Sequence, residues 1–554
     1  MDTKEQRNTN EEIGVGRVVN FRPVFLCVLF LLLGIFVAYL QVVEKGNALL
    51  SIVLVLLLPL PFFFFVRKKQ RFFVCVAVLY AAFLLGNGVF SSVVGRYQDA
   101  PTYNGEYYVV GIVTEKNPTS SGGELVLTDL TIDGEQVDGQ MTINANKSIF
   151  TALDFCDEVK LLLDVSTYNR IEGNYGFRAE AIADGQIYRG SNVAWYEVQG
   201  RAFRPFSYLR GKLQDTLYAS MGDEGAAVAT AILFGNTSGI EEGLLENVRY
   251  GGIAHVFAVS GLHIGSAFAF CLFLFRRNRI PAPFRFIITA SVLLLYGGIC
   301  GYSASVVRAI ITCLVGYGCT LLGVKYDPLE SLSLAALIVF TLYPTLVFGV
   351  GAQLSFGACL GILLLAKPLR VYMEKCGKTI FSAVRKLCKK PIKSKSVDMF
   401  RRNSSPQPLW VEALEKGCSF LSVSFAAQIA TIPILYNAFG YFSVASIFLN
   451  CLYVPLMSVS FSWLLLLTVI STLFPLAAGG FMYIPNLCIN LFMLPFHMLE
   501  LQVGIIEGSG LSTQAVLCYY GGWIFVSDKF HLKKWQKWGM VGVFFLSFII
   551  CLLL

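Results

Sequence analysis

Long apolar runs recur along most of this chain, and each is about as long as a helix that crosses a membrane. The sequence has 554 residues, of which 55% are apolar and only 14% are charged. Such a composition excludes a water-soluble globule, a disordered chain and a small disulfide scaffold. The chain is therefore predicted to be a polytopic α-helical membrane protein.

The lengths of the apolar runs predict about eleven membrane spans, to within one or two, and twelve candidate segments contribute to this count. Residues 441–475 fit either one broken helix or two helices, of which we favour two, and we expect residues 482–503, which contain His497 and Glu500, to lie at the membrane interface. The other candidate spans cover residues 23–43, 48–66, 72–95, 252–275, 283–302, 304–324, 331–348, 350–366, 511–527 and 539–554.

The distribution of basic residues predicts the orientation of these spans. The short loops at 67–71 and 276–279 are strongly basic, and basic loops stay in the cytoplasm. In the cytoplasmic membrane the N-terminus then lies inside, and the third helix delivers residue 96 to the outer face. The C-terminus is expected outside.

Residues 96–200 break the apolar pattern and carry 7 basic and 16 acidic residues. Their apolar residues form short, β-branched or alternating runs, and Asp133-Gly134 is a hairpin turn signal. These runs predict an inserted small all-β domain, OB-like and extracytoplasmic, with about five strands. The runs cover residues 107–114, 125–132, 141–144 and 159–165.

Tyrosines in this segment have two interpretations. They either stack on nucleic-acid bases, as aromatic residues of OB folds do, or pack in the core of the domain. The net negative charge of the segment favours packing, although both interpretations stay open. The tyrosines concerned are Tyr107, Tyr108, Tyr168, Tyr175 and Tyr188.

The sequence divides into six parts on this basis. They are an N-terminal three-helix membrane segment (1–95), the β-rich domain (96–200), an amphipathic interfacial linker (201–250), a set of core helices (251–366), a basic cytoplasmic loop (367–416) and C-terminal membrane helices (417–554).

Several polar side chains lie within apolar runs, where exposure to lipid would be costly for them. His255, Ser260 and His263 fall in the outer part of an apolar run, and Ser260-Gly261 predicts a break in its helix. Arg308 lies within the outer third of another apolar run. Polar groups at membrane depth usually line a water-filled cavity, whereas hydrogen bonds between helices or snorkelling of Arg308 are the alternatives.

Four further polar residues complete the candidate path. Gln353, Ser355 and Asn450 supply amide and hydroxyl groups in later helices, and Asp327 lies at the inner end of a helical hairpin. Asp327 also has a plainer interpretation, as an ordinary loop carboxylate.

Motifs for catalysis and metal binding are incomplete in this chain. No histidine pair has the spacing of a zinc site, and Gly377-Lys378-Thr379 lacks the earlier glycine of a phosphate-binding loop. Ser260 is weakly similar to the nucleophile of intramembrane serine proteases. We expect no enzymatic activity, no cofactor and no metal, with an intramembrane serine hydrolase as the less favoured alternative.

The segment 254–263, Ala-His-Val-Phe-Ala-Val-Ser-Gly-Leu-His, resembles the signature of the ComEC-type competence channel family. Further similar pieces follow in the family's order: Leu233-Phe234-Gly235-Asn236, Ser305 with Arg308, Asp327, Gln353-Leu354-Ser355-Phe356 and Asn450-Cys451-Leu452. The resemblance covers residues 220–475 well, and the β-rich domain matches the family's extracytoplasmic domain in position.

This resemblance implies a channel that imports single-stranded DNA across the cytoplasmic membrane during natural transformation. A transported strand carries about one negative charge per nucleotide, so its path must be wet and lined by donors. The expected partners are single-stranded DNA, membrane lipid, a DNA receptor outside, an ATP-driven motor inside and a second copy of the chain. Because the family's metallo-β-lactamase-like domain does not appear in the sequence, we expect any nuclease to be a separate protein. A transporter for another anionic or polar solute is the main alternative.

Overall fold

The computed structural model describes residues 22–42, 69–119, 122–167, 179–275, 280–388, 409–498, 505–507, 511–526 and 534–553. The chain divides into two compact units. One comprises Arg22–Phe356 with Leu452–Gly504, and the other comprises Met1–Phe21, Gly357–Cys451 and Ile505–Leu554. The candidate span at 48–66 and the tyrosines at 168 and 175 lie outside the described residues.

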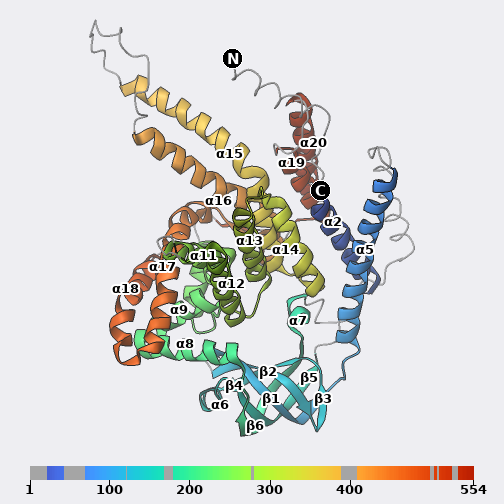
Figure 1. Cartoon of the computed structure of the whole chain (residues 1–554), viewed down its shortest axis with the longest axis vertical. Helices are drawn as coiled ribbons and strands as arrows, with labels where there is room; N and C mark the ends of the chain where they lie inside the picture. The colour runs from blue at the N-terminus through green and yellow to red at the C-terminus, as the bar shows by residue number, and fades with distance from the viewer. Residues whose placement is uncertain are drawn as a thin grey trace. The chain divides into compact units, whose positions relative to one another are not determined.

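Helices make up most of both units (Figure 1). Eight helices among the described residues are long and apolar enough to span a membrane, and three shorter apolar helices cover 261–274, 328–342 and 514–526. The multi-pass α-helical architecture is therefore confirmed, while the total of about eleven spans stays a prediction.

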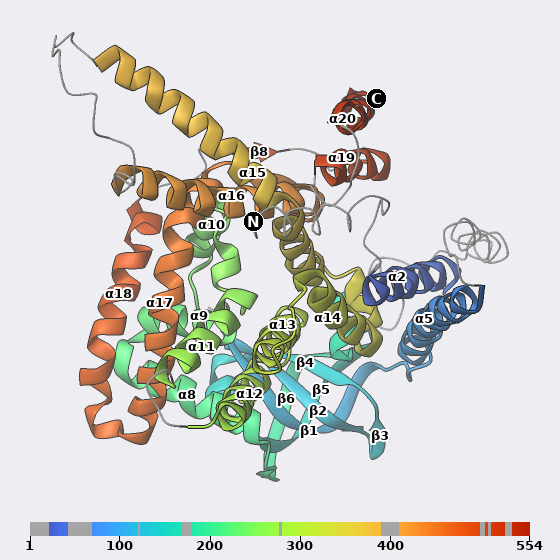
Figure 2. The same cartoon turned by 45° about the horizontal axis from the view of Figure 1, so that its top comes forward.

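The larger unit contains the β-rich domain and the helices around it. Its helices are α2 (Pro23–Val42), α5 (Lys69–Gln98), α8 (Pro205–Met221), α9 (Asp223–Phe234), α10 (Glu242–Tyr250), α11 (Gly261–Leu274), α12 (Ala282–Ile299), α13 (Ala304–Leu321), α14 (Pro328–Leu342), the first turns of α15 (Val350–Cys388), most of α17 (Ala445–Leu473) and α18 (Ala478–Met498). Short 3-10 turns lie at Ala254–Val256 (η1), Pro344–Val347 (η2) and Pro475–Ala477 (η3). Helices α11, α12 and α13 pack against one another (Figure 2).

The β-rich domain is a closed barrel of five strands with a short sixth strand at one edge. Neighbouring strands pair in the order β1-β2-β4-β6-β5 and back to β1, and β4 and β6 run parallel whereas the other pairs are antiparallel. The strands are β1 (Asn104–Thr119), β2 (Gly122–Ile132), β3 (Glu135–Val137), β4 (Gln140–Asn146), β5 (Asp157–Thr167) and β6 (Gln186–Arg201), with the helices α6 (Lys147–Ala152) and α7 (Ala179–Asp184) between them. A small all-β domain is thus confirmed.

Alternation of side chains along the strands builds the barrel core. Along β5 the residues from Val159 to Val165 alternate between fully and partly buried, as expected for one face turned inward. The predicted hairpin turn is present at Asp133-Gly134, where both residues have positive φ and connect β2 to β3. Fully buried residues such as Leu127 and Leu163 form the centre of the core.

Residues 202–250, predicted as the main part of an amphipathic linker, form three helices and short connections. Helix α9 is buried along its whole length from Gly225 to Phe234, and α10 exposes one charged side and buries Leu244 and Val248. The predicted break at Ser260-Gly261 is also present, because α11 begins at Gly261 after the turn η1.

The prediction of two helices in residues 441–475 is wrong. A short strand, β7 (Tyr441–Ser443), is followed by the single helix α17, which continues through Pro455. Membrane helices tolerate proline because neighbouring groups satisfy the freed backbone. Helix α18 follows, and residues 475–496, which overlap the expected interfacial segment, are long and apolar enough to span a membrane.

The second unit is helical apart from one two-stranded pairing. It contains the remainder of α15, α16 (Leu409–Phe439), the start of α17, α19 (Thr513–Val526) and α20 (Lys534–Leu553), and β7 pairs with β8 (Ile505–Glu507). The hydroxyl groups of Tyr519 and Tyr520 donate to the carbonyl oxygens of Ile429 and Ala430, which ties α19 to α16. Residues 389–408 of the predicted basic loop lie outside the described part of the chain.

Candidate functional site

The first turn of α11 holds Ser260 and His263 in a capping box. Ser260 is the N-cap residue, and its side-chain oxygen accepts from the backbone N–H of Leu262 at 3.3 Å. The imidazole of His263 turns back so that its Nδ1 accepts from the Ser260 backbone N–H at 3.0 Å. The contact fixes the tautomer of the ring, because a neutral imidazole whose Nδ1 accepts this bond carries its proton on Nε2.

The second ring nitrogen of His263 is turned into the protein. His263 is 1% exposed, and its Nε2 has no hydrogen-bond partner among the described residues. The ring of Phe461 from α17 packs edge-on against the imidazole, with 4.8 Å between the ring centroids. A buried N–H without a partner is a donor that another molecule or water can use.

The guanidinium group of Arg308 reaches the start of the same helix. A Cβ placed on Gly261 would lie 2.4 Å from Nη2 of Arg308, so a side chain at this position would displace the guanidinium from its present place. The Nη1 atom donates to the backbone carbonyl of Ser355 at 2.6 Å, and the guanidinium lies 5.9 Å from the ring centroid of Phe356. Arg308 is 7% exposed, which excludes the snorkelling conformation in this structure.

Three side chains predicted from the sequence therefore meet in one place. Ser260, His263 and Arg308 surround the N-terminus of α11, and Ser355 joins them through its carbonyl rather than its hydroxyl. The N-terminus of a helix is electropositive, and the guanidinium adds a full positive charge beside it. The site is suited to a negatively charged or strongly polar group.

The contact between Ser260 and His263 has a structural explanation. The Ser260 Oγ lies 3.1 Å from Nδ1 of His263, a distance that a nucleophile and its base would also show. The same Nδ1 accepts from the Ser260 backbone, and the same Oγ accepts from Leu262, as helix capping requires. Capping accounts for both contacts without a catalytic role.

The other predicted path residues lie elsewhere. His255 is exposed and lies in η1, five residues before the cap. Gln353 donates from its side chain to the carbonyl of Val347 at 3.0 Å, which caps η2 locally. Asn450 belongs to the part of α17 in the second unit.

Asp327 occupies the far end of the α13–α14 hairpin. It caps α14 by accepting from the Leu329 N–H at 3.0 Å, and it forms an ion pair with Arg22 at 3.0 Å. The 18 residues of α13 separate it from the Arg308 end by roughly 25 Å, at 1.5 Å per residue. The geometry supports the plainer interpretation of Asp327 as a capping carboxylate.

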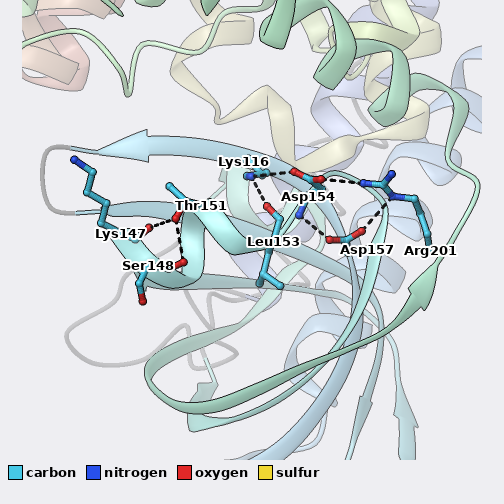
Figure 3. A network of polar contacts seen from close by, with 8 residues as sticks. All are labelled: Lys116, Lys147, Ser148, Thr151, Leu153, Asp154, Asp157 and Arg201. Atoms are coloured by element: carbon cyan, nitrogen blue, oxygen red, sulfur yellow. Dashed lines mark hydrogen bonds and ion pairs between the residues drawn. The ribbon is translucent and has the colours of Figure 1, made fainter.

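Three arginines at the end of β6 and at the start of α8 neutralise part of the acidic charge of the barrel. Each of Arg201, Arg204 and Arg210 contacts at least one carboxylate of the barrel. Arg201 ends β6 and pairs within the barrel, whereas Arg204 and Arg210 fix the start of α8 against it. The pairs are Arg201 with Asp154 at 3.1 Å and with Asp157 at 3.2 Å, Arg204 with Asp129, and Arg210 with Glu115 at 3.1 Å. Figure 3 shows Arg201 between its two carboxylates, with Lys116 on the other side of Asp154.

The tyrosines of the barrel differ in exposure. Tyr188 is fully buried, which raises its pKa to about 12, and its ring packs edge-on against Tyr103. Tyr107 also packs against Tyr103. Tyr108 is 48% exposed. Core packing therefore explains Tyr188 and Tyr107, and of the described candidates Tyr108 alone presents its ring to solvent.

Sequence reasoning missed two residues that shape the site. Gly261 admits the guanidinium of Arg308, and Phe461 covers His263 from a helix about 200 residues further along the chain. Gly261 was marked only as a helix break. No local pattern distinguishes Phe461 from the many other aromatic residues of apolar helices.

Two comparisons with known proteins give matches to this chain. A family model described as "Competence protein" matches residues 232–553, which is more than half of the chain and includes the whole site. The chain is also 24% identical over 232 residues to "ComE operon protein 3" of Bacillus subtilis (strain 168). That match covers 42% of this chain and 25% of the Bacillus protein. No solved structure matches the chain.

Proposed function

This chain belongs to the Competence protein family, and we propose that it conducts single-stranded DNA across the cytoplasmic membrane during natural transformation. The observation that carries the proposal is the meeting of Ser260, His263 and Arg308 at the N-terminus of α11. A buried guanidinium beside a helix N-terminus is costly in an apolar protein, and an anion bound there would offset part of that cost. The phosphates of a strand supply one anion per nucleotide.

The strand order of the barrel supports an OB-like domain. In an OB fold, five strands form a Greek-key barrel. Here β1, β2, β4, β6 and β5 close into such a ring, β4 and β6 are parallel, and α6 connects β4 to β5. We place this domain outside the cytoplasm and the N-terminus inside, from the basic loops at 67–71 and 276–279.

Partners follow from the chemistry of transport. We expect a DNA receptor at the outer face, an ATP-driven motor at the inner face and a separate nuclease for the strand that is not imported, and a second copy of the chain is also proposed. The basic segment 367–416, with 13 lysines and arginines and 4 acidic residues, is proposed to meet the emerging strand.

Replacement of Arg308 tests the proposal. We expect Arg308→Gln, which keeps much of the side-chain volume but removes the charge, to lower DNA uptake by about tenfold or more, since a hydrogen bond to a charged group contributes about 1.5–3 kcal/mol. Surface DNA binding and the amount of protein in the membrane should not change. Arg249→Ala, at an exposed arginine of α10, is the control and should take up DNA normally.

The main alternative is a transporter for another anionic solute, which the same donor cluster would suit. Reconstituted vesicles that contain the purified protein separate the two, with labelled single-stranded DNA in one set and small organic and inorganic anions in the other. Anion flux that depends on Arg308, without DNA entry, would favour the alternative.

A further inference from the structure

The segment Leu233–Asn236 is a junction between three parts of the larger unit. It ends α9, and Gly235 adopts the left-handed conformation with φ of 78°, where its N–H donates to the Ala231 carbonyl. The carbonyl of Leu233 accepts from the Tyr296 hydroxyl of α12 at 2.6 Å. The segment is therefore anchored to buried helices on one side.

Gly235 touches the residue that precedes the site. A Cβ on Gly235 would lie 3.2 Å from Cγ2 and 3.3 Å from the backbone nitrogen of Val259. Val259 is directly followed by Ser260, whose backbone N–H and hydroxyl orient His263. The position of Gly235 thus limits where the cap of α11 can lie.

Asn236 extends the junction to the barrel. Its side-chain amide donates to Oδ1 of Asn117 at 3.0 Å and to the carbonyl of Lys116 at 3.5 Å, and both acceptors lie in β1. Its side-chain oxygen accepts from the backbone N–H of Ser238 at 3.1 Å. Asn236 is 9% exposed, so these bonds are shielded from water.

The end of β1 is in turn fixed within the barrel. The Lys116 ammonium donates to the carbonyl of Leu153 and lies 3.9 Å from Asp154, which also pairs with Arg201 of β6 (Figure 3). Burial lowers the pKa of this ammonium, and the Asp154 carboxylate opposes that shift. The segment that bonds to Asn236 therefore moves with the barrel.

We propose that Asn236 and Gly235 are positioning residues that couple the β barrel to the Ser260–His263–Arg308 site. The contacts run from Asn117 through Asn236 and Gly235 to Val259, and then to the cap of α11. A displacement of the barrel, such as binding at its surface would cause, changes the orientation of His263 through this junction. Only the effect of this coupling on DNA transport rests on the proposed function. The coupling itself is a property of the fold and can be measured without DNA.

Amide hydrogen exchange of the full-length protein in lipid nanodiscs tests the coupling without DNA. Asn117→Ala removes the closer of the two barrel acceptors of Asn236, about 140 residues before the cap, and leaves only the 3.5 Å contact to the Lys116 carbonyl. We expect exchange in the peptide 254–264 to become about threefold faster or more, the range that loss of one hydrogen bond implies. Peptides from residues 304–321 should exchange as in the unaltered protein and serve as the internal reference.

Matched variants separate the hydrogen bond from general damage. Asn117→Asp keeps an acceptor for Asn236 and should exchange like the parent, and Asn144→Ala, at an exposed asparagine of β4, should do the same. Gly235→Ala acts from the other end, since alanine is strained at this φ and its Cβ approaches Val259. It should speed exchange in the same peptide.

Unchanged exchange at 254–264 in Asn117→Ala would overturn the proposal, as would equal acceleration in Asn117→Asp. In transformation assays Asn117→Ala should lower DNA uptake and leave surface DNA binding intact. If the unaltered protein imports no DNA, the proposed function fails, and the exchange result still decides whether barrel and site are coupled.

Discussion

Replacement of Gly261 by alanine tests the geometry of the site most directly. The new Cβ would lie 2.4 Å from Nη2 of Arg308, whereas unstrained carbon contacts lie at about 3.5 Å or more. The guanidinium must then retreat by about 1 Å, which would stretch its 2.6 Å bond to the Ser355 carbonyl beyond hydrogen-bonding distance. Loss of this bond costs about 1.5–3 kcal/mol.

If the conducting state is destabilised by the free energy of this lost hydrogen bond, DNA uptake falls by about tenfold or more. Transformation frequency and internalised labelled DNA are measured beside the amount of protein in the membrane. Gly265→Ala is the matched control, since it lies one turn further along α11 and a Cβ there meets nothing within 4 Å. Its uptake should be normal, and its stability equal or higher by about 0.5–1 kcal/mol. Normal uptake by Gly261→Ala would refute the assignment of Arg308 to the site.

Three further predictions concern stability, measured by thermal unfolding of the protein in detergent. Arg210→Ala should destabilise the larger unit by about 1–2 kcal/mol, because it removes both the ion pair to Glu115 and a buried aliphatic stem. Tyr188→Phe should cost less than about 0.5 kcal/mol, because the buried hydroxyl has no hydrogen-bond partner among the described residues. Burial opposes ionisation of Asp327, but the N–H of Leu329 and the guanidinium of Arg22 outweigh it and lower its pKa. The Asp327 carboxylate therefore stabilises the fold fully above the ordinary carboxyl pKa, and this stabilisation is lost as the pH falls through the lowered value. Asp327→Asn should make stability less dependent on pH in this acidic range.

Local patterns predicted the elements whose physics is local. The Ser260-Gly261 break follows from residues that cap helices, and the bonds that form there join positions three apart or fewer. The turn at Asp133-Gly134 and the alternation in β5 are equally local. The two helices expected in residues 441–475 failed for the opposite reason. The apolar run was divided by its length, whereas in the structure one helix continues through it and through Pro455, which a helix packed among other helices tolerates.

The site itself depends on contacts that no window of sequence contains. Arg308 meets the start of α11 across 47 positions, and Phe461 covers His263 across almost 200. Polar residues in apolar runs identified Arg308 and His263 as candidates, because burial of such groups needs a reason. The same criterion also selected Gln353, which the fold uses for local capping, and Asp327, predicted from its place at the end of a hairpin, likewise caps a helix. The free-energy cost of burying a polar group selects candidate residues from the sequence. Only the contacts of these residues in the structure show whether they form one common site or act separately, for example as helix caps.

The net charge assigned to the barrel depends on where the domain is taken to end in the sequence. Counted over residues 96–200 the domain is strongly acidic, which argues against contact with DNA. The arginines at 201, 204 and 210 lie just beyond that boundary, and each pairs with a carboxylate of the barrel. Part of the negative charge therefore fixes α8 in place and is neutralised where it does so. A negative net charge of the domain does not imply a negative surface everywhere.

At Tyr108, which is 48% exposed, the ammonium of Lys160 lies 5.2 Å from the ring centroid. Proteins that bind single strands combine cations with exposed aromatic rings in this way. Whether a position on the barrel suits a nucleic-acid strand therefore depends more on the charges near that position than on the total charge of the domain.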